Sequence, residues 1–353
     1  MRLDGKKGKG NQMRIPEFLK DNDAIGFIAP SFGCNIEPYR SAFDNAQKKF
    51  RSLGYELHLG PNCYEGQGIG ISNTPEKCGE EVNDFFINKP GKAIFSCGGG
   101  ELMCEILDYV DFERIKKAES KWYVGYSDNT NLTFLLATLC DVASIYGPCA
   151  PAFGMEPWHD SLEHLMGILT GNRSCVSGYP LWERESKKDE THPLEPYHVT
   201  EPRILKMHPK QPSASMEGRL LGGCLDCLGK LVGTKYDRVA DFADRYKEEG
   251  IIWYMEACEL NVMDIRRTLW QLDHAGWFRH VRGFFFGRPM CHGEEIFGLD
   301  QYRAVTGILE KYQVPIVMDL DIGHIPPMMP MVNGALGKVD VMGNDISISY
   351  FFL

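Results

Sequence analysis

Short apolar segments alternate with amphipathic segments along residues 23–140, and this alternation constrains the fold more than any other feature of the chain. The segments 23–31 and 55–62 each end at a proline- or glycine-containing turn and are typical of buried strands. The segments 36–54 and 74–88 have apolar residues about 3.6 positions apart, which is typical of helices. Strands that alternate with helices form a parallel sheet with crossover helices. We therefore expect an α/β fold.

The length of 353 residues suits two domains of ordinary size, and the character of the chain changes between them. Residues 1–22 are polar and predict a loose N-terminal arm, followed by an α/β domain over 23–171. Residues 172–216 are polar, carry repeated prolines and predict a strand-poor connection and substrate-facing flap. Apolar runs resume in 217–353 and predict a second α/β domain.

Charge and composition exclude several classes of function. A net charge of -10 disfavours binding of a nucleic-acid polymer, because phosphate contacts need a basic surface. We see no secretion signal and no apolar segment long enough to cross a bilayer, so we expect a cytoplasmic protein without a membrane partner. Because thiols are kept reduced in the cytoplasm, we expect the 12 cysteines to be reduced. Cys224 and Cys227 form a lone Cx2C without a second ligand pair, so we expect no metal and no cofactor.

The segment VGYSDNTNLTFLLATL places Ser127 between an apolar strand and an apolar helix. A serine at such a turn exposes its hydroxyl beside free backbone N–H groups, which is the geometry of a nucleophile elbow. Ser127 or Asp128 can equally be an ordinary helix cap, because both residue types are common caps. The segment supplies a candidate nucleophile and leaves the capping role open.

Three consecutive glycines, Gly98, Gly99 and Gly100, follow the predicted strand KAIFS. Glycines let the backbone approach a ligand closely and present N–H donors to it. One of these donors and the N–H of Asp128 are candidates for an oxyanion hole. A plain tight turn explains the glycines as well, whereas a Walker loop is disfavoured because no Lys-Ser/Thr pair follows.

Two further candidates come from the second predicted domain. Glu256 ends the apolar run IIWYME, and His324 follows Gly323 after the apolar run VPIVMDLDI. A carboxylate at a strand end can orient a histidine, and a histidine on a loop can act as a base. Glu259 and His292 are the nearest rivals for these two roles. Each signal is weak alone, but together they supply a nucleophile, a base, an orienting acid and backbone donors.

These segments, taken together, resemble the LD-carboxypeptidase family of serine peptidases. The resemblance rests on IGFIAPS, the glycine pair at 99–100 with LDYVDF behind it, GYSDNT, GRLLGGCL, IIWYMEACEL and DIGHIPP, which run in the family's order over nearly the whole chain. The length and the proline-rich insertion are more similar to the microcin C self-immunity branch than to the short murein-recycling enzymes.

The resemblance implies a flavodoxin-like parallel-sheet N-terminal domain and a smaller barrel-like α/β C-terminal domain, usually as a homodimer. It implies that Ser127, His324 and Glu256 form a Ser-His-Glu triad. The oxyanion donors would be the backbone N–H groups of Asp128 and of a glycine in the pair Gly99–Gly100. One departure concerns that pair, because many members carry an arginine before it and Tyr-Gly after it, and this chain has neither.

The implied activity is hydrolysis of an amide bond through an acyl-enzyme. Two substrates fit the family: an LD-peptide of murein turnover, or an aminoacyl-nucleotide similar to microcin C. A different class stays open, namely a catalytically silent protein that binds or senses a peptide on the same fold. A carboxypeptidase must also bind a free carboxylate.

Arg266 and Arg267 in MDIRRTLWQL are candidates to anchor that carboxylate, although a surface salt bridge explains them equally well. On a helix only one of the two would face the site. Aromatic side chains in and near the insertion can stack a base, pack on a sugar or simply cover the core. We expect Trp182 to contact substrate; the others are Trp158, Tyr179 and Tyr197.

Overall fold

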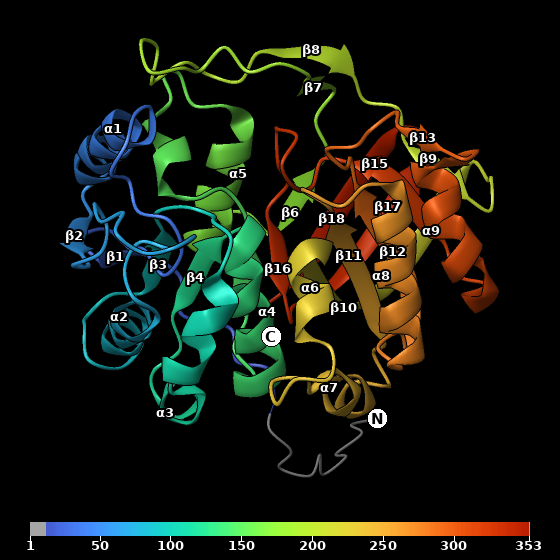
Figure 1. Ribbon diagram of the computed structural model, residues 1–353, viewed down its shortest axis with the longest axis horizontal. Helices are drawn as coiled ribbons and strands as arrows, with labels where there is room; N and C mark the ends of the chain where they lie inside the picture. Colours follow the sequence, from blue (N-terminus) through green and yellow to red (C-terminus); the bar gives the residue numbers. More distant parts are fainter. Residues whose placement is uncertain (1–11, 353) are drawn as a thin grey trace, which may run out of the picture.

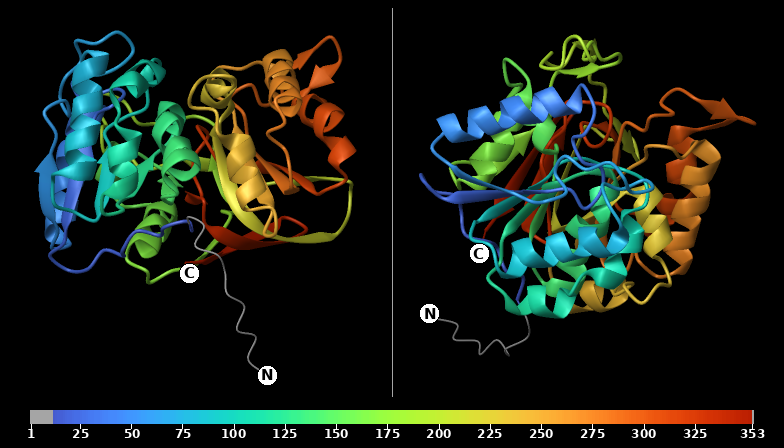
Figure 2. Two further views of the ribbon diagram at one scale, coloured as in Figure 1. Left: turned by 90° about the horizontal axis from the view of Figure 1, so that it is seen from below. Right: turned by 60° about the vertical axis from the view of Figure 1, so that its left-hand side comes forward.

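The computed structural model describes residues 12–352, which form two large β-sheets that stand side by side with helices packed on them (Figure 1, Figure 2). The first sheet has six strands in the order β16-β5-β4-β3-β1-β2. Its strands are β1 (Ala24–Ile28), β2 (Glu56–Leu59), β3 (Ala93–Ser96), β4 (Trp122–Gly125), β5 (Ser144–Tyr146) and β16 (Met331–Asn333). Its helices are α1 (Tyr39–Ser52), α2 (Pro75–Ile87), α3 (Phe112–Lys117), α4 (Thr130–Cys140) and α5 (Asp160–Leu169), with 3-10 turns η1 (Met103–Tyr109), η2 (Ser127–Asn129) and η3 (Ala150–Gly154).

Strands β1 to β5 are parallel and follow the order 2-1-3-4-5, which is the flavodoxin-like arrangement. Adjacent residues on a strand face opposite sides of the sheet. Phe27 accordingly packs with α1, whereas Ile28 packs with α2 in a second apolar cluster. In this order the strand sequence reverses between β1 and β3, and ligands bind outside the carboxyl ends of the strands at that point. The Gly98–Gly100 turn follows β3 there.

The second sheet has eight strands in the order β6-β18-β17-β10-β11-β12-β15-β9. Its four central strands β10 (Ser213–Cys224), β11 (Ile251–Glu256), β12 (Val281–Gly287) and β15 (Ile316–Leu320) are parallel, and β17 (Leu336–Met342), β18 (Asp345–Phe351), β6 (Cys175–Ser177) and β9 (Lys206–His208) are antiparallel to their neighbours. Helices α6 (Leu225–Leu231), α7 (Val239–Arg245), α8 (Val262–His274) and α9 (Gln301–Leu309), the turn η4 (Glu310–Tyr312) and the hairpin β13–β14 (Glu295–Ile296, Leu299–Asp300) complete this part. The expected α/β fold with two domains is confirmed.

Each sheet borrows strands from outside its predicted domain. Strand β16 comes from the C-terminal part of the chain but pairs with β5 of the first sheet, while β6 and β9 come from the connection and extend the second sheet. One apolar cluster also runs through both sheets, so the two domains share a core. Interlocking of this kind fixes the carboxyl ends of both sets of parallel strands relative to each other.

Two predictions about the less regular segments were wrong. The connection 172–216 is not strand-poor, because it carries β6, β9 and the hairpin of β7 (Leu181–Glu183) with β8 (Val199–Pro202), which lies across the top of the molecule in Figure 1. Residues 1–11 of the predicted arm lie outside the described part. Residues 12–22 are packed rather than loose, because Met13 and Leu19 are buried and Arg14 forms a bridge to Val142.

Within residues 12–352, none of the helices combines the length and the apolarity that a bilayer crossing requires.

A buried ionic cluster ties the start of the connection to the loop after β15. Asp321 is fully buried and receives a charged hydrogen bond from Arg288, which is 1% exposed. The other Asp321 carboxylate oxygen accepts the backbone N–H of Tyr179 at 2.7 Å and lies 3.4 Å from the Arg203 guanidinium. Removing one partner of a buried pair leaves an uncompensated charge in the interior.

We therefore expect Asp321→Ala to lower the free energy of unfolding by about 3–5 kcal/mol, because the buried Arg288 would lose its counter-charge and Arg203 would keep only its pair with the exposed Asp345. Arg267→Ala is the matched control, since Arg267 is exposed and pairs with Asp264 on the surface. That control should change stability by less than about 1 kcal/mol. Urea unfolding curves measure both, and equal stability of the two variants would contradict the assignment.

Candidate active site

Ser127 stands at the turn between β4 and α4, and its backbone has the left-handed φ of +63°. A non-glycine residue in this region is strained, and a strained serine after a strand is the hallmark of a nucleophile elbow. The backbone N–H of Ser127 donates to the Tyr146 hydroxyl at 3.0 Å. Neither Ser127 nor Asp128 caps a helix: Asn129 occupies the N-cap of α4, and no side chain caps that end.

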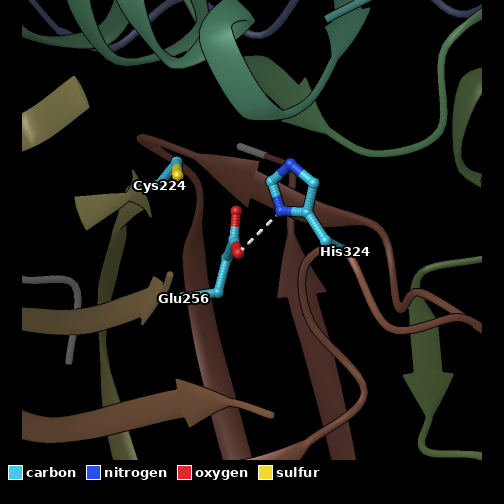
Figure 3. Close-up of side chains that lie close together, drawn as sticks. All are labelled: Cys224, Glu256 and His324. Carbon is cyan, nitrogen blue, oxygen red and sulfur yellow. Dashed lines mark hydrogen bonds and ion pairs between the residues drawn. The ribbon is translucent and has the colours of Figure 1, made fainter. Parts of the chain in front are cut away.

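The structure brings Ser127 together with His324 and Glu256. His324 Nε2 lies 2.8 Å from Ser127 Oγ, and His324 Nδ1 lies 2.9 Å from Glu256 Oε2. Glu256 is the last residue of β11, and His324 is on the loop after β15, pointing toward the carboxylate (Figure 3). Gly323 allows this approach, because a Cβ at that position would lie 2.6 Å from the Glu256 side chain.

The Glu256 carboxylate is 1% exposed and has a partner on each oxygen. Oε2 faces His324, and Oε1 accepts the hydroxyl of Tyr146 at 2.5 Å. Tyr146 thus connects the acid to the backbone of Ser127. A buried carboxylate is tolerated only when such partners replace water.

The pKa of His324 is set by opposing effects. Burial by itself lowers this pKa, but the Glu256 carboxylate, together with the Cys258 thiol beside the ring, outweighs burial and raises it well above its usual value. The Glu256 carboxylate thus stabilises the charged form of the imidazole and holds the ring in place. The ring of Tyr126 covers one side of the imidazole, with ring centres 5.1 Å apart.

Asp128 is buried and holds together the loops around Ser127. One of its carboxylate oxygens accepts the Ser31 hydroxyl at 2.7 Å and the backbone N–H of Met103 at 2.9 Å. Burial raises the pKa of Asp128 to about 6. Its side chain therefore joins the loop after β1 and the turn η1 to the turn that carries Ser127.

Of the two glycines predicted to donate to an oxyanion, Gly99 lies beside the hydroxyl. A Cβ at Gly99 would lie 3.0 Å from Ser127 Cβ and 3.1 Å from Oγ. Gly100 packs elsewhere, since a Cβ there would meet the Ser31 hydroxyl at 2.2 Å. A side chain at position 99 would therefore crowd the Ser127 hydroxyl, and glycine avoids this contact.

Ser127 and His324 open onto a pocket of about 570 Å³. Its walls come from the loops after β1 to β5 and from the connection 172–216. The flap residues that line it are Glu183, Ser186, Lys188, Glu195, Pro196 and Tyr197.

The two arginines predicted to anchor a carboxylate do not line this pocket. Arg266 donates to the backbone carbonyls of Arg303 and Gly307 on α9, and Arg267 pairs with Asp264 on the surface. Both predictions were wrong, because the face that α8 presents to the site depends on how the helix packs.

Trp182, predicted to contact substrate, also lies outside the pocket. On β7 it faces away from the neighbouring Glu183: its ring packs against His292 and lies 5.2 Å from the Arg288 guanidinium. His292 is therefore beside Trp182 rather than Ser127. The rival acid Glu259 is exposed.

Sequence reasoning missed Tyr146, Glu183 and Lys188. Tyr146 ends β5, and its position at the carboxyl end of a parallel strand was the only available signal. Among the described residues that line the pocket, Lys188 is the only lysine or arginine. It is half-buried, and burial lowers its pKa, with Glu183 acting in the opposite direction.

Figure 3 shows Cys224, Glu256 and His324 close together, and each offers a ligand atom within 4.8 Å of the other two. Cys224 ends β10, beside Glu256 in the parallel pairing of β10 with β11. A thiol, a carboxylate and an imidazole form a donor set that suits zinc.

Comparison with known proteins places this chain within one family. Residues 25–147 match the LD-carboxypeptidase N-terminal domain, and residues 217–339 match the LD-carboxypeptidase C-terminal domain, together well over half of the chain. The chain is similar to the microcin C7 self-immunity protein MccF of Escherichia coli, with 25% identity over 347 residues that cover 95% of each chain. It is also similar to the murein tetrapeptide carboxypeptidase of Pseudomonas aeruginosa, with 24% identity over 77% of this chain and 79% of the other.

The fold is shared with solved structures. A structure of MccF in complex with glutamyl sulfamoyl guanosine aligns with a TM-score of 0.77 at 21% identity, covering 97% of this chain and all of the other.

The raised pKa of His324 leads to a direct test. In the folded protein the imidazole should titrate above its usual pKa of about 6.5, and Glu256→Gln should lower the pKa because the neutral amide no longer stabilises the imidazolium. NMR titration of the ring protons measures this. Glu259→Gln removes a nearby but exposed carboxylate and should leave the titration almost unchanged, so an equal effect of the two variants would refute the assignment.

Proposed function

Because this chain belongs to the LD-carboxypeptidase family of serine peptidases, we propose that Ser127, His324 and Glu256 are its catalytic triad and that it hydrolyses an amide bond through an acyl-enzyme. The observation that carries the proposal is the continuous hydrogen-bonded chain from Ser127 Oγ through the imidazole to the Glu256 carboxylate. A nucleophile, a base and an orienting acid in mutual contact are what acyl transfer requires.

In the acylation step, neutral His324 accepts the Ser127 proton at Nε2 while Oγ attacks the amide carbonyl. The negative charge that develops on the carbonyl oxygen is stabilised by the backbone N–H groups of Gly99 and Asp128. His324 then gives the proton to the departing amine, leaving an ester on Ser127. Water repeats the sequence, losing a proton to His324, and releases the acid product.

Glu256 holds Nδ1 of the imidazole so that Nε2 faces Ser127, and it stabilises the imidazolium that forms in each half-reaction. Tyr146 is a positioning residue in this scheme. Its hydroxyl accepts the Ser127 N–H and donates to Glu256, so it sets the distance between the elbow and the acid.

We expect Ser127→Ala to lower kcat by at least about 10,000-fold while the fold is retained, because the nucleophile is lost. Turnover measured by mass spectrometry and labelling by a fluorophosphonate probe test this together. The parent should be labelled at Ser127, and the variant should not. The rival function, a silent peptide-binding protein, is favoured if the parent binds peptide saturably without labelling and without turnover.

The pocket also bears on the substrate. A carboxypeptidase binds a free carboxylate, and the half-buried cation of Lys188 faces the same pocket as Ser127. We assign Lys188 as the anchor for the anionic end of the substrate, in place of the two arginines. A charged hydrogen bond in a partly desolvated site contributes about 1.5–3 kcal/mol.

The relatives described above point to two substrate classes. One is an LD-peptide of murein turnover, in which the anion is the terminal carboxylate. The other is an aminoacyl-nucleotide of the kind that MccF holds as glutamyl sulfamoyl guanosine. Incubation with each class, followed by mass spectrometry of the products, distinguishes them. The cytoplasmic location, which was expected because no secretion signal was seen, stays a prediction. The homodimer implied by the family resemblance also stays a prediction, and sedimentation measurements can test it.

The role of Lys188 is tested by Lys188→Met, which keeps a side chain of similar length but removes the charge. For a substrate with a free carboxylate we expect KM to rise at least about tenfold. For the same substrate with that carboxylate converted to an amide, KM should change little. Lys187→Met is the matched control, because the adjacent Lys187 is exposed and does not line the pocket. The assignment fails if both variants behave alike or if the amidated substrate is affected equally.

A further inference from the structure

We propose that Cys224, Glu256 and His324 form a binding site for a thiophilic divalent cation such as Zn²⁺, and that an occupied site blocks catalysis. The binding depends only on the arrangement of these three side chains. The block rests in addition on the proposed triad, since Glu256 and His324 belong to both.

The geometry is close to what such an ion needs. The three ligand atoms lie within 4.8 Å of one another, and Glu256 Oε2 and His324 Nδ1 are already 2.9 Å apart. Ligand bonds of about 2.0–2.3 Å place the ligands of a tetrahedral zinc ion roughly 3.5 Å apart. A small inward shift of the Cys224 thiol and a slight separation of Glu256 from His324 would meet this requirement.

Hydrogen bonds from neighbouring groups orient metal-binding side chains in known sites, and similar contacts surround the three side chains here. Tyr146 donates to Glu256 Oε1, which holds the carboxylate while Oε2 faces the imidazole. The backbone N–H of Cys224 donates to Thr130 Oγ1 at 3.0 Å, which fixes the end of β10. The Cys224 thiol itself donates to Asp226 Oδ2 at 3.2 Å. The Asp226 carboxylate can therefore accept the thiol proton when the metal ion binds.

The donor set selects the class of ion. A thiolate and an imidazole favour Zn²⁺ over Mg²⁺ or Ca²⁺, which prefer oxygen ligands. Cys224 is 1% exposed, and burial raises the pKa of its thiol well above the usual value. The thiol is therefore neutral until an ion replaces its proton, and the thiolate and the Glu256 carboxylate then balance the two charges of the ion.

The block follows from the two nitrogens of the imidazole. An ion on Nδ1 takes the lone pair that faces Glu256 and leaves the ring proton of the neutral imidazole on Nε2. Nε2 is the nitrogen that faces Ser127, 2.8 Å from Oγ. A protonated Nε2 cannot accept the serine proton, so the nucleophile is not activated.

Binding can be tested without any substrate. Co²⁺ is a spectroscopic substitute for Zn²⁺, and a thiolate ligand gives a charge-transfer band in the near ultraviolet. We expect one equivalent of Co²⁺ to produce this band in the parent and in Ser127→Ala, because Ser127 is not a ligand. Cys224→Ala should abolish the band, and Cys224→Ser should do so with less disturbance of packing. Circular dichroism verifies that each variant is folded.

Two matched variants separate this site from other thiols. Cys258 lies near His324 and Cys175 is exposed on β6, so Cys258→Ala and Cys175→Ala should keep the band. For inhibition, each protein is compared with its own metal-free rate. Zn²⁺ should inhibit the parent reversibly, with release by EDTA, and should be at least tenfold weaker against Cys224→Ala.

The outcomes are distinct. Absence of the Co²⁺ band in the parent, or its survival in both Cys224 variants, overturns the site. Metal binding through Cys224 without any loss of turnover overturns the block while the site stands. A parent without turnover, but with a band that depends on Cys224, counts against the proposed function and leaves the metal site intact.

Discussion

The functional geometry depends on one hydrogen-bonded chain that crosses from the first sheet to the second. It runs from the Ser127 hydroxyl through His324 to Glu256 and returns through Tyr146 to the Ser127 backbone. Ser127 and Tyr146 belong to the first sheet, while Glu256 and His324 come from the second part of the chain. Distances of 2.5 to 3.0 Å survive only if the two sheets are rigidly placed. The pairing of β16 with β5 and the shared apolar core supply that rigidity.

These hydrogen bonds also explain why several features that lower the stability of the fold are retained at the site. Glu256 is buried, Ser127 has a left-handed backbone, and Gly323 stands where any side chain would collide with the carboxylate. A buried charge and a strained backbone are each destabilising, and both are retained only where surrounding contacts over-determine them. Here the same contacts satisfy the carboxylate and hold the hydroxyl toward the pocket. Stability and function are thus coupled at this point of the fold.

The flap gives the pocket its chemical character. The first domain contributes mainly glycines, tyrosines and apolar side chains to the walls, whereas the flap contributes Glu183, Lys188 and Glu195. In the proposed function the elbow and the triad cleave an amide, and the charges of the flap bear on which amide is bound. The thiol of Cys224 lies next to Glu256 and His324 but takes no part in the proposed cleavage or in substrate binding. It is the side chain on which the proposed metal site depends.

The sequence alone determined the alternation of strands and helices, the parallel sheet and the positions of Ser127, Glu256 and His324, because these depend on local patterns. Apolar runs form strands wherever they can be buried, and polar residues at the ends of parallel strands gather at one edge of a sheet. The resemblance to a family was needed to join the three residues across their long separation in the chain.

Only the tertiary structure decided the remaining points. Arg266 and Arg267 turned away from the site because α8 packs against α9, and Trp182 faced Arg288 while its neighbour Glu183 lined the pocket. The local sequence also did not indicate that β16 pairs with the first sheet or that β6 and β9 of the connection extend the second sheet, because their partners lie far away in the chain. Which face an element presents, and to what, is set by long-range packing, and local sequence periodicity does not contain that information.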